Sequence, residues 1–194
     1  MILPIIAYGD PVLRTVAKDI PQDFPELDKL ISDMFETMYR AHGVGLAAPQ
    51  IGKAIRLFVI DTAPMEDEEE NHEGEEKDAA GGVKKAFINP VILKEEGEKW
   101  AFEEGCLSIP GIRGDVYRPS DLVIRYFDEN WQEHTDSFNG MTARVIQHEY
   151  DHIEGKLFTD LVSPLKKRLI KGRLAKISKG DVDVDYKMKF PVKR

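Results

Sequence analysis

The sequence predicts an α+β fold, built as a single domain with a mostly antiparallel sheet. A chain of 194 residues with 42% hydrophobic content suits one globular domain of ordinary size. The order of patterns is an amphipathic helix, several strand-like runs and then further helices. This order lacks the alternation of strand and helix that parallel sheets require, so we expect neighbouring strands to run antiparallel.

Three helices are predicted. Residues 27–41 carry apolar side chains at helical spacing, with Pro25 just before the pattern and Gly43 just after it. Residues 141–152 show the same spacing and place two histidines on one face. A third, basic helix is predicted to open at Pro164 and to continue to about residue 176.

Strands are predicted where β-branched and aromatic residues gather. Residues 55–61 form a nearly continuous apolar run, which indicates a largely buried strand. Further strands are expected at 86–93, 100–103, 121–128 and 132–138, with a short one in the alternating stretch 182–190. Residues 62–85 are rich in acidic and small side chains that cannot bury enough apolar surface to offset ordering entropy, so we expect a mobile surface loop there.

Charge and cysteine content limit the possible functions. Residues 66–78 carry the whole of the net charge of −8, and the rest of the chain is neutral. We therefore expect no nucleic-acid site, since such sites cluster Lys and Arg. The single cysteine, Cys106, excludes an intramolecular disulfide. The sequence contains no export signal and no run of about 18 apolar residues that could cross a membrane, so we expect a cytoplasmic protein.

Residues 148–152 read HEYDH, which matches the HExxH pattern. On a helix, His148 and His152 lie one turn apart and can bind one metal ion, with Glu149 beside them. The same pattern would also arise from two ordinary core or surface histidines that bind no metal. A catalytic metal needs about three protein ligands and one open position. A histidine six residues after His152 is excluded because that residue is Phe158, and Cys106 is the remaining soft candidate.

Three separated motifs resemble those of peptide deformylases and follow the family's order. They are GVGLAAPQ at residues 43–50, EGCLS at 104–108 and QHEYDH at 147–152. The resemblance runs from about Asp10 to Asp160 and leaves the acidic stretch and the tail unexplained. It implies antiparallel sheets packed around the helix that carries HExxH. The implied activity is removal of the formyl group from the N-terminal formyl-methionine of nascent polypeptides.

Carried over residue by residue, the resemblance implies a metal site made by Cys106, His148 and His152, with water in the fourth position. Glu149 would act as general base and then general acid while the metal-bound water attacks the formyl carbon. The side-chain amide of Gln50 and the backbone N–H of Leu107 would stabilise the developing negative charge. The implied cofactor is one divalent ion, Fe²⁺ in the cell, with Zn²⁺, Ni²⁺ or Co²⁺ as substitutes.

The resemblance also implies where a nascent N-formyl-methionyl peptide would bind, with the ribosome exit as the expected meeting point. Val44 and Gly45 would pair with the extended peptide backbone. The methionine side chain would enter a pocket lined by Val44, Phe102, Met141 and Val145, although these residues could equally form ordinary core. We expect Arg144 at the pocket rim. Glu104 and Arg113 would either orient the metal ligands or form a surface ion pair.

Two other functions fit parts of the sequence. A metalloendopeptidase could use HExxH, but a lone cysteine ligand without a downstream His or Glu motif argues against it. A closed structural metal site or an inactive binding module would need a fourth protein ligand, and none is evident. The presence of Glu149 and Gln50 favours an enzyme.

Overall fold

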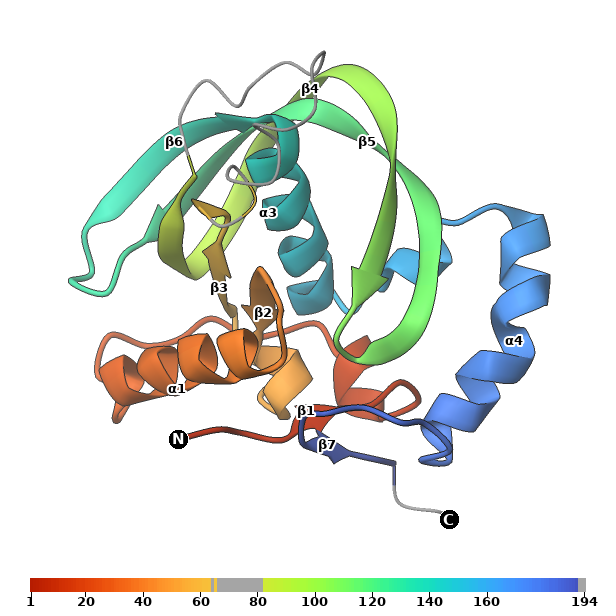
Figure 1. The fold of residues 1–194 in the computed structure, drawn as a ribbon. Helices are drawn as coiled ribbons and strands as arrows, with labels where there is room; N and C mark the ends of the chain where they lie inside the picture. Colours follow the sequence, from red (N-terminus) through yellow and green to blue (C-terminus); the bar gives the residue numbers. More distant parts are fainter. Residues whose placement is uncertain (64, 66–81, 192–194) are drawn as a thin grey trace.

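The computed structural model describes residues 1–63, 65 and 82–191 (Figure 1). Five strands form the main sheet in the order β2-β3-β4-β5-β6, and every neighbouring pair is antiparallel. The strands are β2 (Gly45–Ala47), β3 (Leu57–Asp61), β4 (Lys84–Cys106), β5 (Ile109–Phe127) and β6 (Glu133–Asn139). The α+β prediction is therefore confirmed, whereas most of the acidic loop expected at 62–85 lies outside the described residues.

Two helices cover opposite faces of this sheet. Alternate residues of β3 point to opposite faces, so Val59 packs with helix α1 (Leu27–Arg40) and Phe58 packs with helix α3 (Gly140–Ile153). This two-sided burial explains the continuous apolar run that predicted a buried strand. Figure 1 shows α3 held against the inner side of the curved β4–β5 hairpin. Helix α3 is thus the central helix that the sequence predicts.

The β4–β5 hairpin is longer than the sequence predicts. Residues 86–93 and 100–103 belong to one strand, β4, and β5 begins at Ile109 instead of near 121. The charged stretch 94–99 hid the continuity of β4, because both of its faces are solvated there. In β5 the buried side of the strand includes Gly114 and Arg118, which breaks the apolar alternation. The hairpin turns at Leu107 and Ser108, between the paired residues Cys106 and Ile109.

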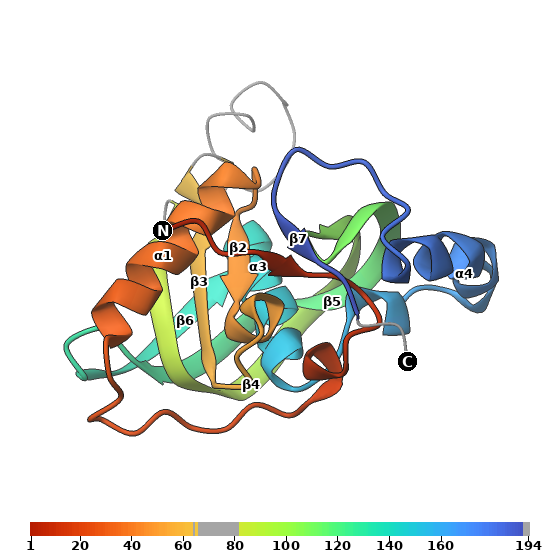
Figure 2. The ribbon, with the colours of Figure 1, turned by 90° about the horizontal axis from the view of Figure 1, so that it is seen from below.

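The tail returns to the N-terminus after helix α4 (Pro164–Ser178). In the stretch 182–190 only strand β7 (Met188–Lys189) is regular, and it pairs parallel with β1 (Ile5–Ile6), a pairing that the sequence did not predict (Figure 2). Short 3-10 helices lie at Pro11–Arg14, Ala48–Ile51 and Phe158–Asp160. Among the described residues, no helix is long and apolar enough to span a membrane.

Candidate metal centre and active-site cleft

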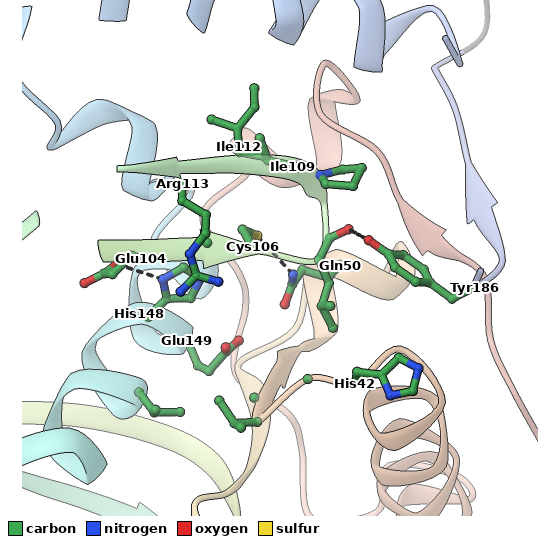
Figure 3. A pocket seen from close by; sticks show the side chains of 18 of the residues that line it. His42, Gln50, Glu104, Cys106, Ile109, Ile112, Arg113, His148, Glu149 and Tyr186 are labelled. Atoms are coloured by element: carbon green, nitrogen blue, oxygen red, sulfur yellow. Dashed lines mark hydrogen bonds and ion pairs between the residues drawn. The ribbon is translucent and has the colours of Figure 1, made fainter. Parts of the chain in front are cut away.

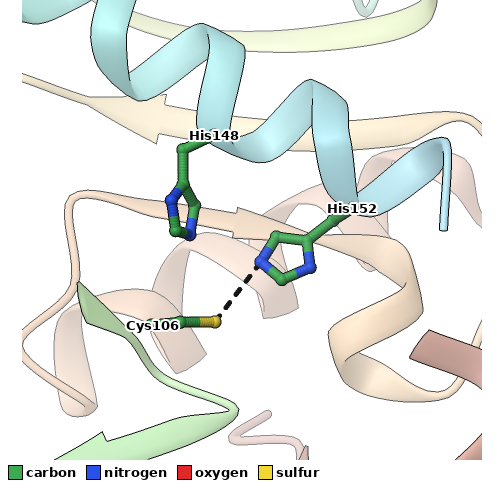
Figure 4. Close-up of side chains that lie close together, drawn as sticks. All are labelled: Cys106, His148 and His152. Carbon is green, nitrogen blue, oxygen red and sulfur yellow. Dashed lines mark hydrogen bonds between the residues drawn. The ribbon is translucent and has the colours of Figure 1, made fainter. Parts of the chain in front are cut away.

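The two histidines of HExxH and the only cysteine meet in one place (Figure 4). Helix α3 presents His148 and His152 one turn apart, with ring centroids separated by 5.2 Å. Cys106 ends strand β4 at the hairpin turn, and its Sγ lies 3.4 Å from Nε2 of His152. The ligand atoms of the three residues all lie within 4.8 Å of one another. The sequence predicted this grouping correctly.

The spacing of these atoms suits a tetrahedral metal. With metal–sulfur and metal–nitrogen bonds of about 2.3 and 2.0–2.1 Å, a tetrahedral angle separates sulfur from nitrogen by about 3.5 Å. The distance of 3.4 Å between Cys106 and His152 agrees with that value. Among the described residues the group contains three ligands, so one coordination position would stay open. An open position is typical of catalytic sites and not of structural ones.

A buried carboxylate fixes the orientation of His148. Oε2 of Glu104 lies 2.9 Å from Nδ1 of His148, which leaves Nε2 to face the metal centre. Arg118 donates two hydrogen bonds to the same carboxylate, at 2.7 and 3.0 Å, and Arg144 donates a third at 2.9 Å. Burial alone would raise the pKa of Glu104, but the contacts with His148 and Arg118 outweigh it and hold the pKa well below its usual range.

The structure separates the two possibilities left open for Glu104 and Arg113. Glu104 is 4% exposed and contacts His148, one of the three clustered side chains. Arg113 is more than half exposed and pairs with Glu103 at 3.3 Å, so it forms the surface ion pair. The sequence analysis did not find Arg118, because its role depends on the register that sets it on the same side of the hairpin as Glu104.

Glu149 lies beside the centre without belonging to the ligand group. Its side chain is buried, and its Oε2 has no hydrogen-bond partner among the described residues. Burial raises the pKa of Glu149 to about 7. Gly45 packs directly against it, since a Cβ at that position would stand 2.4 Å from Oε1 of Glu149. Glycine is therefore required there if the carboxylate is to keep its place.

Gln50 is held by the backbone and directed at the cysteine. Its Oε1 accepts a hydrogen bond from the N–H of Ala47 at 2.9 Å, which fixes which end of the amide faces the site. Its Nε2 donates toward Sγ of Cys106 at 3.4 Å (Figure 3). The same nitrogen donates toward Oγ of Ser108 at 3.3 Å. The sequence analysis missed Ser108, a fully buried residue whose only sequence signal was its place in the EGCLS motif. Leu107 lies between Cys106 and Ser108 in the turn and is half-buried.

A cavity of about 720 Å³ opens onto this centre. Its walls include every residue that the sequence predicted for substrate binding, namely Val44, Gly45, Phe102, Met141 and Val145. Its walls also include residues 183–186 of the tail, which the sequence had not assigned to the site. The structure therefore brings the predicted residues to one cleft.

The expectation that Arg144 sits at the pocket rim is wrong. Its side chain lines the cleft but is only 2% exposed. Besides Glu104, its guanidinium donates to the carbonyl oxygens of Val116 and Trp100, at 2.8 and 2.7 Å. A buried guanidinium needs such acceptors, and these contacts fix α3 against both strands of the hairpin.

The family model and the similar sequences all name the same protein family. The family model described as polypeptide deformylase matches residues 2–168. The peptide deformylase of Christiangramia forsetii is 62% identical over 191 residues, which cover 98% of this chain and 97% of the relative. That of Cytophaga hutchinsonii is 59% identical over 194 residues and covers all of both chains.

Solved structures give the same likeness. The crystal structure of a peptide deformylase from Legionella pneumophila has a TM-score of 0.78 and 36% identity, covering 93% of this chain and 98% of that one. The structure from Thermotoga maritima has a TM-score of 0.71 and 38% identity, covering 84% of this chain and 99% of that one.

Proposed function

The chain belongs to the polypeptide deformylase family, and from this premise we propose which of its residues perform the family's reaction. The protein is a metal-dependent hydrolase that removes the formyl group from the N-terminal formyl-methionine of nascent polypeptides. Family membership overturns the alternatives of a metalloendopeptidase and of a closed structural site. The observation that carries the residue assignment is the meeting of one thiol and two imidazoles beside a buried carboxylate that has no partner among the described residues.

We propose Cys106, His148 and His152 as the ligands of one divalent cation. A bound cation would activate water and withdraw electron density from the formyl oxygen. Glu104 supports the assignment, because a histidine ligand is commonly held by a hydrogen bond from its second nitrogen to a carboxylate. A thiolate with two imidazoles accepts several first-row metals, and we propose Fe²⁺ as the ion used in the cell, with Zn²⁺, Ni²⁺ or Co²⁺ as substitutes.

Glu149 is proposed as the group that moves the proton. Its carboxylate accepts a proton from the attacking water and then delivers it to the amine that leaves the formyl carbon. Its burial supports this role, because a carboxyl whose pKa lies near 7 can both take up and release a proton at neutral pH. Gly45 supports it further by leaving room for the carboxylate.

The negative charge that develops on the formyl oxygen needs fixed hydrogen-bond donors. We propose the Nε2 amide of Gln50 and the backbone N–H of Leu107 for this task. The bond from Ala47 to Gln50 holds the amide ready, so the donor is oriented before substrate arrives. The methionine side chain would lie in the cleft between Val44, Phe102, Met141 and Val145, with Val44 and Gly45 pairing with the peptide backbone.

We also propose that the protein works in the cytoplasm, close to the ribosome exit. Helix α4 supports this location, because it carries six basic side chains and no acidic one, and nearly all of the six are exposed. This is the basic helix that the sequence predicted from Pro164. The double variant Lys167→Glu and Lys171→Glu should co-sediment less with ribosomes than the parent and keep its activity on free peptides. Equal co-sedimentation would argue against α4 as the contact.

One experiment tests the residue assignment. Released formate is measured on a formyl-methionyl tripeptide, and metal content is measured on the same sample, prepared without oxygen. Cys106→Ala and His152→Ala should each lose metal and activity, because one of three ligands is removed. His134→Ala, a matched histidine change on β6 outside the cleft, should keep both. Full metal content in Cys106→Ala would overturn the ligand set.

A further inference from the structure

The tail of the chain reaches the residue proposed as an oxyanion donor. The hydroxyl of Tyr186 donates a hydrogen bond to the carbonyl oxygen of Leu107 at 2.8 Å, and Figure 3 shows this hydroxyl directed at the turn. Tyr186 also lines the cleft itself. The match to the family model ends at residue 168, so the contact comes from a part of the chain outside that match.

The segment that carries Tyr186 is held in place on both sides. After it, β7 pairs with β1, and the N–H groups of Ile5 and Ala7 donate to the carbonyl oxygens of Lys187 and Lys189, both at 2.9 Å. Before it, Val182 packs into the apolar cluster that Ile109 and Ile112 form beneath the hairpin. The hydroxyl is therefore presented by an anchored segment and not by a loose end.

The turn that receives this bond is held at the residue before Leu107 and at the residue after it. Cys106, just before Leu107, would be held by the metal, and the carbonyl of Ser108, just after it, accepts a hydrogen bond from the N–H of Tyr8 at 2.9 Å. Between these two points, the Leu107 carbonyl accepts its hydrogen bond from Tyr186. If that bond were lost, the peptide plane between Leu107 and Ser108 could rotate, and the backbone angles of Leu107 would change with it. The Leu107 N–H, which lies in the preceding peptide plane, would then no longer be held in one direction.

We propose that Tyr186 is a positioning residue for deformylation. By holding the carbonyl of the peptide bond between Leu107 and Ser108, it fixes the backbone of Leu107, so that the Leu107 N–H, in the preceding peptide bond, faces the formyl oxygen in the transition state. The inference rests on the proposed role of Leu107. Preorganisation of this kind favours the transition state more than the bound substrate, so its loss should lower kcat and leave KM nearly unchanged.

The test compares two substitutions of Tyr186. Tyr186→Phe keeps the ring and removes only the hydroxyl, so kcat on a formyl-methionyl tripeptide should fall by roughly 3- to 10-fold, as expected for one neutral hydrogen bond. KM should change less than about twofold, and metal content should match the parent. Tyr186→Leu should lose at least as much, and Tyr117→Phe, which removes a hydroxyl from an exposed tyrosine on β5, should change nothing.

Amide hydrogen exchange over residues 103–110 supplies a second measurement, and in Tyr186→Phe it should become faster. If Tyr186→Phe keeps the parent kcat while Tyr186→Leu loses it, ring packing is what matters and the inference is overturned. If amide exchange over residues 103–110 becomes faster in Tyr186→Phe while kcat stays at the parent value, the Leu107 N–H does not act in the reaction. That result would overturn both the proposed role of Leu107 and the inference about Tyr186. Failure of the parent to release formate would contradict the proposed function before Tyr186 is considered.

Discussion

Replacing Glu104 with alanine should weaken both the fold and the metal centre. The Glu104 carboxylate is 4% exposed and contacts Arg118 twice, Arg144 once and His148 once, at distances of 2.7 to 3.0 Å. Removing one partner of a buried ion pair typically costs about 3–5 kcal/mol, because the other charge stays buried without compensation. Arg118 would keep Asp151 at 2.8 Å, which favours the lower end of that range.

We therefore expect Glu104→Ala to lower the free energy of unfolding by about 3 kcal/mol, a large share of the roughly 5–15 kcal/mol typical of a domain. Loss of the contact to His148 should also weaken metal binding by about 10- to 100-fold. Denaturant unfolding with a chelator present measures the loss of fold stability without any contribution from bound metal. Competition with a metal indicator measures the loss of metal affinity.

The adjacent residue provides the matched control. Glu103 is 61% exposed and pairs with Arg113 at the surface, so Glu103→Ala should cost less than about 1 kcal/mol and leave metal affinity unchanged. A Glu104→Ala protein within about 1 kcal/mol of the parent, with parent metal affinity, would refute the reasoning that this carboxylate neutralises the buried arginines and orients His148.

Three further predictions follow from other parts of the molecule. Val145→Phe should fill the cleft and sharply reduce activity on formyl-Met peptides at normal metal content, and unchanged activity would move the methionine pocket elsewhere. Burial alone would raise the pKa of Asp160, but hydrogen bonds from Arg14 and from the N–H of Leu157 outweigh it and lower the pKa. The ionised carboxylate therefore stabilises the fold above about pH 4, and this stabilisation is lost as the pH falls through the lowered pKa. Asp160→Asn should accordingly lower the free energy of unfolding by about 0.5–1 kcal/mol at pH 7, allowing for partial exposure, and by progressively less below about pH 4. An equal loss in urea unfolding at pH 7 and below about pH 4 would contradict this. Deleting residues 66–78, whose composition predicts a surface loop, should keep turnover within a few-fold of the parent, and a loss of about 100-fold would assign that stretch to the site.

Local patterns in the sequence predicted the parts of this protein that depend on local geometry. His148 and His152 lie one turn apart on a helix whatever the rest of the fold does, so the HExxH pattern was sufficient to pair them. The apolar spacing that predicted a helix over 27–41 corresponds to α1, which ends at Arg40. Cys106 became a candidate on chemical grounds, because a catalytic metal on HExxH needs a third ligand and the chain offers one thiol, and the family resemblance then assigned it.

Contacts that depend on strand register and on the path of the tail were not predictable in this way. Arg144 looked like a rim residue because its acceptors, the carbonyls of Trp100 and Val116, come from two strands far away in the sequence. Tyr186 reaches Leu107 only because β7 pairs with β1 at the other end of the chain. Neither contact leaves a periodic signal in the residues nearby.

The substitution Glu149→Gln is the sharpest test of Glu149 as the group that moves the proton, because it keeps size and shape at the buried position while removing the proton acceptor. We expect the variant to bind one equivalent of metal and to keep its fold. Turnover on a formyl-methionyl peptide should fall by about 10⁴-fold or more, since one group serves both proton transfers. Glu129→Gln, at an exposed position, should match the parent. A Glu149→Gln protein that binds metal normally and deformylates at close to the parent rate would contradict the proposed mechanism.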